Sequence, residues 1–595
     1  MINFRQPDVE NFFQTFGIQT FTVNKEETQL VFSTNLNGKY NLWAMDLPNA
    51  FPYPLSFYNQ SCSELAYDKQ GRYILAVMDQ DGDENGQIYA VPPTGGSLEP
   101  LRTHEGARHM GMNLSKDGER LYFTSTKEDQ TYLKSYCYDI KEQEEKVIHE
   151  GKDAATYLTA KSPNEQAIVY VKHYANTYVL AFVKKDGQEV YLTPDREEQH
   201  TVSGIEFVSD TLIYFTTNYG EDFSYLARFN LEHESFEKVA AIEKEDFDDV
   251  YYDQSSNSLY IRAEKGVKDK LYQFDLKEET LDEIDIPTTE IAGLKVADSG
   301  NLYLSGRTAV RPANIYMRKD GQWKQLTKYN VPGVKEEEMA EPELHTYKSF
   351  DGLEIEAQFF KAKPENSNGH VILWPHGGPQ AAERATFRSL FQFLVYRGYS
   401  IFAPNFRGST GYGLKFSKMV EGDWGHGPRL DNIEGLEYLF KKGLADRDKV
   451  LLMGGSYGGY MALLLHGRHA DYFKAVVDIF GPSNLFSFIE SVPEHWKPVM
   501  KQWVGDPVED KERLTKDSPI EYLDSMTKPM FVIQGAKDPR VVKAESDQIV
   551  EALKEKGRDV KYLVLDDEGH GFSKKANEMR VYEEVLRFFD AYINS

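Results

Sequence analysis

Cysteine is scarce in this chain. Its 595 residues include two, Cys62 and Cys137, too few for the disulfide framework of a secreted scaffold, and we expect both to be buried free thiols. Long apolar runs are also missing, because no stretch of about 18 or more apolar residues occurs. The first residues, MINFRQPDVENFFQTFG, lack a basic segment followed by an apolar one, so no signal peptide is predicted. These absences predict a cytoplasmic protein without membrane partners.

Positive charge is in short supply as well. The chain has 68 Lys and Arg against 94 Asp and Glu, a formal net charge of −26 at pH 7. Such a surface repels phosphates, which argues against nucleic acid as a partner. The proportions of hydrophobic residues, 41%, and charged residues, 27%, are ordinary for a globular protein. At this length a single core stops growing, so two domains are expected.

Short β-rich runs recur through the first half at intervals of 43 to 48 residues, a period within the range of propeller blades. They begin at Leu30, Tyr73, Leu121, Ile168, Leu212, Leu259 and Leu302. Each is followed by a polar turn and a second aromatic strand, as in LYFTST and SYCYDI. Paired strands at a fixed period predict four-stranded blades around a channel. We therefore expect a seven-bladed β-propeller over residues 21–335, preceded by residues 1–20, a segment with a helix packed on the second domain.

One loop of this half has the spacing of a calcium-binding loop. DQDGDENGQIYA begins at Asp79 and places aspartates at alternate positions. A calcium loop has glycine at its sixth position and glutamate at its twelfth, where this loop has Glu84 and Ala90. We interpret it as a polar hairpin turn and predict no metal and no cofactor.

The pattern changes after NVPGVKEEEMAEPE, a Pro/Gly break followed by an acidic run. Short apolar strands such as KVLLMGG then alternate with longer helical stretches such as DNIEGLEYLFKKG. This alternation predicts an α/β domain whose mostly parallel sheet is covered on both faces. We place that domain over residues 336–595.

A glycine-caged serine interrupts the apolar core of the second domain. Gly454, Ser456 and Gly458 fit the pattern G-x-S-x-G between a predicted strand, KVLLMGG, and a predicted helix, YMALLLHG. At such a turn the glycines let strand and helix approach closely, and the serine hydroxyl points off the sheet as a nucleophile. The alternative, a phosphate-binding loop, requires a lysine after its last glycine, and none follows here. Ser456 is therefore the predicted nucleophile.

A serine nucleophile needs a base, and the base needs an acid that orients it. With the chain order serine, acid, histidine, Asp538 in GAKDPRVV and His570 in EGHGF fit, because both follow predicted strands. Loops at the carboxyl ends of parallel strands meet at one edge of a sheet. The weaker candidates are His466, His469, Asp566 and Asp567. The two histidines end a helix, and the two aspartates are too close to His570 along the chain to orient it.

The oxyanion of a tetrahedral intermediate needs fixed N–H donors. One is predicted to be the backbone N–H of Tyr457, directly after the nucleophile, and the other that of Gly377 or Gly378 in WPHGGP. His376 in the same loop lies early in the sheet, so we expect it to hold the loop rather than act as the base.

The segment GPSNLFSFIESVPEHWKPVMKQW lies between the nucleophile and the acid. Its apolar side chains predict a pocket for an apolar substrate side chain, although their spacing fits core packing equally well. The candidates are Phe486, Phe488, Ile489, Trp496 and Trp503.

Taken together, HGGP, NFRGSTGYG, GGSYGGYMAL, GAKDPRV and DDEGHGF after a seven-bladed propeller resemble the prolyl oligopeptidase family of serine peptidases over essentially the whole chain. HGGP and GGSYGGY look more like its acylaminoacyl peptidase branch than like prolyl oligopeptidase itself. The resemblance implies an α/β-hydrolase fold, Gly378 as the second oxyanion donor and Arg540 as a ligand of a substrate main-chain carbonyl. It also implies that the propeller covers the site and admits short peptides only. Dipeptidyl peptidases of the family hold the substrate amine with paired glutamates, but Glu197-Glu198 lacks their sequence context and that role is not transferred.

The leading hypothesis is a serine peptidase, similar to acylaminoacyl peptidases, that hydrolyses short peptides with Ser456, Asp538 and His570 as its triad. One alternative is a carboxylesterase acting on small acyl esters, which would leave the propeller without a role. Another is dipeptidyl or oligopeptidase specificity. A non-catalytic propeller interaction protein is disfavoured, because no triad member is missing. Homo-oligomers stay open, since edge strands of a blade or of the sheet could pair between subunits.

Overall fold

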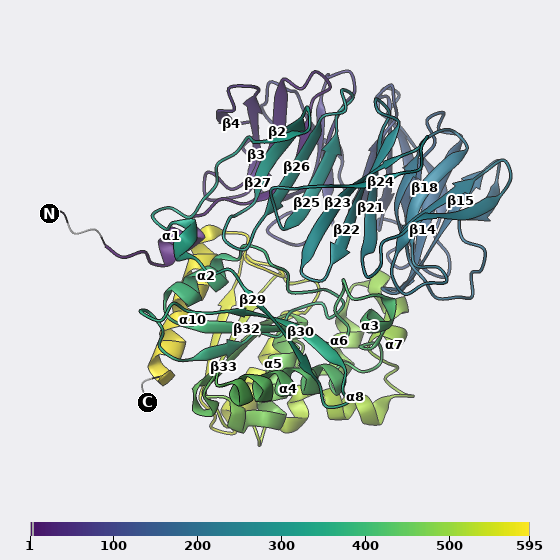
Figure 1. The fold of residues 1–595 in the computed structure, drawn as a ribbon. Helices are drawn as coiled ribbons and strands as arrows, with labels where there is room; N and C mark the ends of the chain where they lie inside the picture. The colour runs from purple at the N-terminus through teal and green to yellow at the C-terminus, as the bar shows by residue number, and fades with distance from the viewer. Residues whose placement is uncertain (1, 3–4, 594–595) are drawn as a thin grey trace.

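The computed structural model describes residues 2 and 5–593. Residues 1 and 3–4, which belong to the predicted N-terminal segment, and residues 594–595 lie outside the described residues. In Figure 1 the first half of the chain, purple to teal, lies above the second half, green to yellow.

Within the described residues, β1–β28 form seven four-stranded sheets, each built from four strands consecutive in the chain. The first four sheets are β1–β4 (Ile18–Val23, Gln29–Thr34, Asn41–Asp46, Pro52–Pro54), β5–β8 (Cys62–Tyr67, Ile74–Met78, Gln87–Val91, Glu99–Arg102), β9–β12 (His109–Leu114, Arg120–Ser125, Lys134–Asp139, Glu144–Glu150) and β13–β16 (Ala155–Lys161, Ala167–Ala175, Tyr178–Lys185, Gln188–Tyr191). The last three are β17–β20 (Val202–Phe207, Leu212–Thr217, Tyr225–Asn230, Ser235–Ala240), β21–β24 (Asp246–Asp253, Ser258–Lys265, Lys268–Asp275, Leu281–Ile284) and β25–β28 (Glu290–Val296, Leu302–Arg307, Asn314–Lys319, Gln322–Gln325). They are the blades of a seven-bladed propeller, which confirms the predicted repeat.

Side-chain contacts join the first blade to the last. Phe21 lies in one apolar cluster with Tyr303 and Ile315. Glu27 accepts hydrogen bonds from Asn301 (2.9 Å) and Tyr303 (2.7 Å). Because every blade uses consecutive strands, the ring closes through packing and these hydrogen bonds rather than through a shared sheet.

The second half forms one eight-stranded sheet in the order β29-β30-β32-β31-β33-β34-β35-β36. Its strands are β29 (Glu343–Lys348), β30 (Glu354–Phe360), β31 (Val371–Leu373), β32 (Ser400–Asn405), β33 (Val450–Gly455), β34 (Val476–Ile479), β35 (Met530–Gly535) and β36 (Val560–Leu565). The first two neighbouring pairs in that order are antiparallel, and the pairs from β32 to β36 are parallel. This is the α/β-hydrolase sheet that the sequence predicts.

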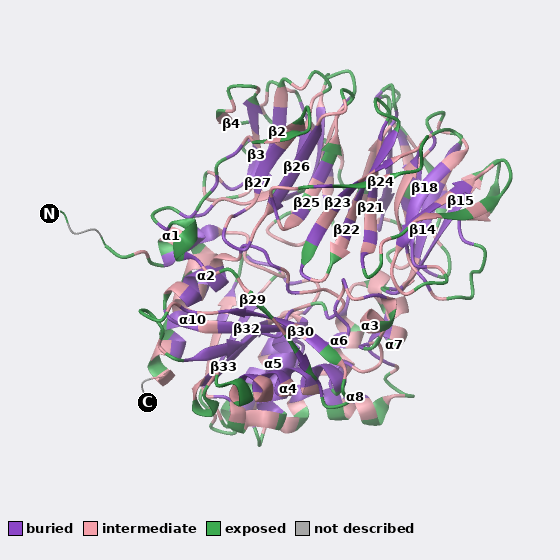
Figure 2. Cartoon of the chain, viewed as in Figure 1, coloured by how far each residue is buried: buried purple, intermediate pink, exposed green. Residues whose placement is uncertain are grey.

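Helices cover both faces of this sheet (Figure 1). They are α2 (Ser389–Tyr396), α3 (Leu414–Lys418), α4 (Gly427–Lys442), α5 (Tyr457–His469), α6 (Leu485–Ser491), α7 (Lys497–Trp503), α8 (Lys511–Asp517), α9 (Lys543–Glu555) and α10 (Lys575–Ile593), with single 3₁₀ turns at η1 (Glu336–Glu338), η2 (Arg447–Lys449), η3 (Ala470–Tyr472), η4 (Glu494–Trp496) and η5 (Pro519–Tyr522). Val450 and Leu452 of β33 enter one apolar cluster, and Leu451 and Met453 enter the other. A strand whose alternate residues are buried on opposite faces reads as a continuous apolar run, which explains KVLLM. Figure 2 shows the same concentration of buried residues in the central strands.

A short helix, α1 (Val9–Phe13), precedes the first blade and packs on α2 and α10 of the hydrolase domain. Asp8 caps it by accepting a hydrogen bond from Val9 N, as expected for a helix N-terminus. Phe12 and Phe13 are fully buried, and the Phe13 ring lies 5.0 Å from that of Tyr582. The chain therefore contacts the hydrolase domain before it enters the propeller, while the exact domain limits of 20, 335 and 336 stay predictions.

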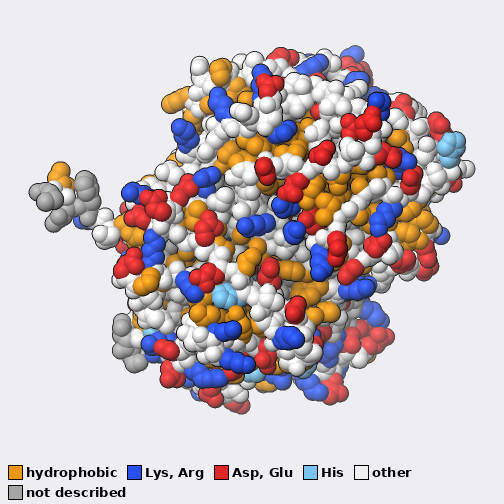
Figure 3. All heavy atoms as spheres, in the orientation of Figure 1, with side chains coloured by type: hydrophobic (Ala, Val, Ile, Leu, Met, Phe, Trp, Pro, Cys, Tyr) orange, Lys and Arg blue, Asp and Glu red, His pale blue; other side chains and the backbone are white. Residues whose placement is uncertain are grey.

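Both cysteines are free, but Cys62 is buried and Cys137 only partly so, so the prediction of a buried thiol is wrong for Cys137. On the face drawn in Figure 3, acidic and basic side chains are interspersed over both domains. No helix within the described residues has both the length and the apolar character needed to cross a bilayer.

We expect Phe13→Ala to lower the free energy of unfolding of the hydrolase domain by about 3–5 kcal/mol, because it removes a buried aromatic ring from a packed site. Urea denaturation followed by tryptophan fluorescence measures the change. Glu10→Ala, on the exposed side of the same helix, is the control and should have little effect. A loss below about 1 kcal/mol for Phe13→Ala would contradict the docked position of α1.

Candidate active site

The turn between β33 and α5 holds Ser456 in a strained conformation, with φ 58° and ψ −124°. A non-glycine residue adopts a positive φ only when its surroundings enforce it. The flanking glycines make this possible. A Cβ atom at Gly454 would lie 2.1 Å from the carbonyl oxygen of Gly458, and one at Gly458 would lie 2.1 Å from that of Pro375. Strand, helix and the Pro375 loop therefore meet at backbone contact around the serine.

Ser456, His570 and Asp538 form a continuous hydrogen-bonded chain. The Ser456 Oγ lies 2.9 Å from His570 Nε2, and His570 Nδ1 lies 2.6 Å from Asp538 Oδ2. The other carboxylate oxygen of Asp538 accepts from the backbone N–H groups of Arg540 (2.9 Å) and Val541 (3.0 Å). The Asp538 side chain has no exposed surface and that of His570 is 8% exposed. This arrangement can deprotonate the serine and stabilise the resulting imidazolium.

The weaker candidates lie elsewhere. His466 is buried and accepts a hydrogen bond from Lys528 N (3.0 Å), while His469 contacts Arg429. Asp567 binds Lys574 and Asn577. None of them has a contact with Ser456 or His570 within the described residues.

The loop after β31 lies close to Ser456, as the sequence predicts for the loop that supplies the second oxyanion donor. A Cβ atom at Gly377 would lie 3.4 Å from the Ser456 Cβ, and Gly378 lines a cavity together with Ser456 and Tyr457. Tyr457 is the first residue of α5, so its N–H has no acceptor within the helix. Gly378 has φ +132°, a conformation that favours glycine.

His376 holds this loop. Its Nε2 lies 2.8 Å from Ser409 Oγ, and its ring stacks on Phe406 at 4.2 Å. Burial lowers the pKa of His376 to about 4, so the ring is neutral at physiological pH. It is too deeply packed to act as a base for Ser456.

A small aromatic cavity of about 90 Å³ opens beside Ser456. Its lining includes Phe488, Trp496 and Trp503 from the predicted pocket segment, together with Arg540. Phe486 and Ile489 do not line it, because they lie on other sides of α6 from Phe488 and pack as partly buried residues against the core. The cavity has room for one apolar side chain.

Sequence reasoning missed Trp424, which forms a wall of this cavity. The indole is 1% exposed and lies edge-on to the Tyr457 ring at 5.1 Å, and Tyr457 Oη donates to the Trp424 carbonyl (2.6 Å). Trp424 comes from EGDWGHG, far along the chain from the other lining residues. A lone tryptophan in a glycine-rich loop is the signal that could have identified it.

A larger cavity of about 610 Å³ lies between the propeller and the loop of His570. Four acidic residues line it, Glu568 of the hydrolase domain and Glu64, Asp79 and Glu84 of the propeller. Asp79 Oδ1 is buried with no hydrogen-bond partner in the described part of the chain. Burial, together with the negative charge of Asp83, raises the pKa of Asp79 to about 6. The cavity therefore places propeller carboxylates, together with the basic side chain of Arg108, next to His570.

Arg540 connects the two cavities. Its Nε lies 2.7 Å from Glu84 Oε1, and the second carboxylate oxygen of Glu84 lies 3.3 Å from Arg108 Nη1. Arg540 reaches the aromatic cavity while its charge is balanced by a residue of the propeller. The sequence did not indicate Glu84 as its partner.

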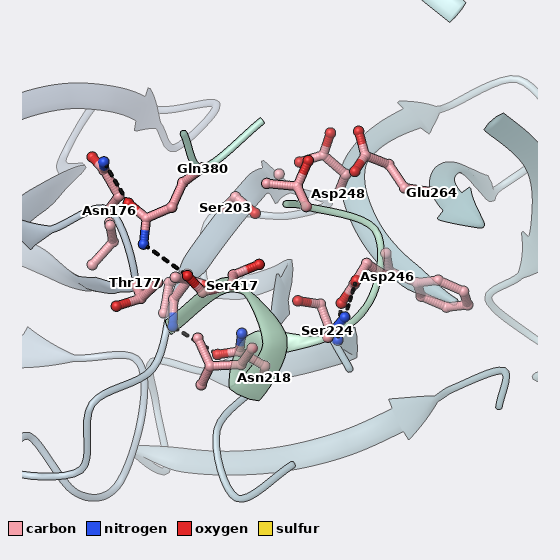
Figure 4. Close-up of a pocket in the computed structure, with 18 of the residues that line it drawn as sticks. Asn176, Thr177, Ser203, Asn218, Ser224, Asp246, Asp248, Glu264, Gln380 and Ser417 are labelled. Atoms are coloured by element: carbon pink, nitrogen blue, oxygen red, sulfur yellow. Dashed lines mark hydrogen bonds between the residues drawn. The ribbon is translucent and has the colours of Figure 1, made fainter. Parts of the chain in front are cut away.

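A third cavity, of about 480 Å³, separates blades four to six from the loop around Gly413 (Figure 4). Asn176 donates to Gln380 Oε1 (2.8 Å), and Gln380 donates to the Ser417 carbonyl (3.2 Å). Gln380 follows Gly378-Pro379, so these bonds tie the oxyanion loop to both the propeller and α3. Burial raises the pKa of Asp246 to about 6 and of Glu264 to about 7 on the opposite wall.

Glu568 organises the loop that carries His570. Its carboxylate is fully buried and accepts from Ser573 N (2.9 Å), Lys574 N (3.0 Å) and Asn577 Nδ2 (2.8 Å). A buried carboxylate with several donors fixes the backbone around it. Among the described residues, no group of three or more His, Cys, Asp or Glu is placed to hold a metal ion.

An α/β-hydrolase with a serine-histidine-aspartate chain, covered by a seven-bladed propeller, is the class of protein that this fold and site define. Residues 385–595, within the hydrolase domain, match the model of the prolyl oligopeptidase family.

Individual relatives match part of the chain. The chain is 41% identical over 224 residues to Dipeptidyl peptidase family member 6 of Caenorhabditis elegans, an alignment that covers 37% of this chain and 30% of that protein. The chain thus spans about a third of the length of that relative.

Solved structures match over almost the full length. A puromycin-hydrolyzing peptidase of Mycobacterium tuberculosis has a TM-score of 0.86 at 19% identity, covering 98% of this chain and 96% of that one. Acylaminoacyl peptidase of Pyrococcus horikoshii has a TM-score of 0.76 at 21% identity, covering 99% and 98%. At these identities the likeness supports the two-domain fold and nothing finer.

Asp478, at the end of β34, supplies a pH-dependent test of the packing around the nucleophile turn. The side chain is fully buried and accepts from Gly481 N (2.9 Å). Burial raises its pKa to about 8, well above that of an unfolded aspartate. Its stabilising contribution is therefore complete below about pH 4 and is lost as the pH rises through about 8.

Asp478→Asn removes this titration and should stabilise the protein progressively from pH 4 to pH 9. Thermal unfolding of both proteins across that range measures the difference. The two melting temperatures should coincide near pH 4 and separate above it. A constant difference at every pH would contradict the raised pKa.

Proposed function

We propose that this protein is a serine peptidase that cleaves short peptides after an apolar residue. The observation that carries the proposal is the hydrogen-bonded chain Ser456–His570–Asp538 beside a small aromatic cavity. In this role Ser456 Oγ attacks the scissile carbonyl while His570 Nε2 takes its proton, and His570 then donates the proton to the leaving amine. Water hydrolyses the acyl-enzyme by the same route. Asp538 keeps Nδ1 of His570 protonated and oriented.

The oxyanion of each tetrahedral intermediate would be bound by the backbone N–H groups of Tyr457 and Gly378. Donors of this kind contribute most because they are already in position before charge develops. The apolar side chain next to the scissile bond would enter the cavity walled by Trp424, Phe488 and Trp503. Arg540 would bind a main-chain carbonyl of the substrate.

A peptidase is favoured over a carboxylesterase by the position of the propeller. It covers the triad and leaves cavities of about 90 and 610 Å³ around it. A small ester needs no such cover, whereas a peptidase gains from it, since folded proteins are excluded by size. The two free thiols, Cys62 and Cys137, support a reducing compartment such as the cytoplasm.

Two kinds of substrate amino terminus, blocked or free, are considered. The sequence motifs favour a blocked, acylated amino terminus. The carboxylates of Glu64, Asp79 and Glu84 favour a second candidate, an exopeptidase that takes a free amine. A cationic amine would pair with the buried, unpartnered Asp79 oxygen, and an acetyl group could not.

The first experiment is hydrolysis of a matched substrate panel by the wild type and Ser456→Ala. The panel contains acetyl-alanyl, acetyl-leucyl and acetyl-phenylalanyl p-nitroanilides, free-amine dipeptidyl anilides, and p-nitrophenyl esters. We expect cleavage of apolar anilides, lowered by about 10⁵-fold or more in Ser456→Ala because the nucleophile is gone. Activity on esters alone would move the assignment to carboxylesterase. Absence of all activity and of fluorophosphonate labelling would favour a non-catalytic role.

Asp79→Asn tests the free-amine candidate. For free-amine substrates kcat/KM should fall by roughly 10- to 100-fold, since a hydrogen bond to a charged group is lost, and for acetylated substrates it should stay unchanged. In the wild type the preference for free-amine over acetylated substrates should weaken as the pH falls through about 6, because protonated Asp79 no longer attracts the amine. Asp186→Asn is the matched control, since Asp186 is exposed in the turn between β15 and β16, outside this cavity. Equal effects of Asp79→Asn on both substrate types would exclude this amine site.

A further inference from the structure

The calcium-like hairpin Asp79–Gly86 joins β6 to β7 in the second blade and projects onto the hydrolase domain. It holds no residue of the triad. Its tip nevertheless contacts the two loops that carry Asp538 and His570. We call this segment the blade-two hairpin.

Asp81 at the tip binds one lysine from each of these loops. Its Oδ2 accepts from Lys537 Nζ (2.9 Å) and its Oδ1 from Lys574 Nζ (3.0 Å). Lys537 directly precedes Asp538, and Lys574 lies four residues after His570. The hydrogen bond from Lys537 is the main cause that holds the pKa of Asp81 well below its usual range. One carboxylate of the propeller thus bridges the acid loop and the histidine loop.

Backbone contact reinforces the bridge. Gly82 and Gly569 lie so close that a Cβ atom at Gly569 would come within 2.1 Å of the Gly82 carbonyl oxygen. Gly569 directly precedes His570. A Cβ atom at Gly535, at the end of β35, would come equally close to the Gly569 carbonyl oxygen. The histidine loop is therefore held between the hydrolase sheet and the blade-two hairpin.

The remaining support of the histidine loop lies within the hydrolase domain. Glu568 fixes its inner side through buried hydrogen bonds, and Lys574 also binds the Asp567 carboxylate (2.8 Å). The backbone N–H of Lys537 joins the histidine loop to the acid loop by donating to the Glu568 carbonyl (3.0 Å). Asp81 adds a second connection, from the propeller, through two charged hydrogen bonds.

We propose that the blade-two hairpin is a positioning element that sets the distance between His570 and Ser456, with Asp81 as its principal residue. The inference rests on the proposed serine-hydrolase function. It makes full reactivity of Ser456 dependent on docking of the propeller. Small displacements of a catalytic base lower the rate steeply, so the loss of Asp81 acts on the chemical step.

Asp81→Asn tests the proposal, because asparagine tolerates the positive φ of 53° at this position and removes only the charge. We expect the rate of Ser456 labelling by a small fluorophosphonate, and kcat for a cleaved anilide, to fall roughly tenfold. KM should change less than about twofold, and the melting temperature should stay within about 2 °C. The fluorophosphonate fills no peptide subsite, so its rate reports the geometry of the triad.

A double-mutant cycle with Lys574→Met checks the partner. Each single variant should slow labelling, and the double variant should be no slower than the worse single one, since both remove the same bridge. Asp222→Asn is the matched control. Asp222 also reaches across the domains, accepting from Lys415 N (2.7 Å), but it contacts α3 rather than the triad loops.

The outcomes separate the two proposals. If the wild type does not react with the fluorophosphonate, the proposed function fails. If the wild type reacts and Asp81→Asn reacts equally fast, the positioning role is overturned while the function stands. A change confined to KM would overturn the positioning role by indicating that Asp81 affects substrate binding. An equal loss of reactivity in Asp222→Asn would overturn it by indicating a general effect of domain docking.

Discussion

The left-handed backbone of Ser456 is the constraint on which the rest of the hydrolase domain depends. A serine with φ 58° at the end of β33 persists only because the surrounding backbone leaves no other path. Gly454, Gly458 and the Pro375 carbonyl meet there with no room for a Cβ atom. The buried run KVLLM fixes the strand on one side of the turn, and the apolar helix α5 fixes the other. The packing of the core thus stabilises the strained backbone conformation of Ser456.

The catalytic groups come from three separate strand ends, and their relative positions depend on the loops that hold them. Ser456 follows β33, Asp538 follows β35 and His570 follows β36. Asp538 is fixed by two backbone N–H groups of its own loop, and the histidine loop is fixed by Glu568. The oxyanion loop is fixed by His376 inside the domain and by the Gln380 bonds across the interface. Every one of these loops therefore has an anchor within the hydrolase domain and a second one in the propeller.

The sequence predicted the features that repeat or lie within one motif. The blade period, the α/β alternation and the turn around Ser456 are local patterns, so the fold could be predicted from them. The pairing of His570 with Asp538 could be proposed from chain order. Glu84 and Asp81 could not, because each meets the site from a distant segment and has an ordinary local context. Trp424 also comes from a distant segment, and its glycine-rich context was the one local signal for it. Phe486 and Ile489 were grouped with Phe488 because composition does not give the rotation of a short helix.

The calcium-like loop illustrates why such contacts escape a local reading. Its aspartates have the spacing of calcium ligands, yet the acidic side chains of this loop bind different partners. Asp83 caps the hairpin itself, Asp81 pairs with two lysines, and Glu84 balances Arg540. The charges of Asp81 and Glu84 are balanced by basic side chains of the hydrolase domain. In a chain with a net charge of −26, the basic residues that lie next to Asp538 and His570 therefore give the hairpin a specific place to dock. Two carboxylates of the hairpin, Asp81 and Glu84, and the basic side chains of Lys537, Lys574 and Arg540 thus form one interface.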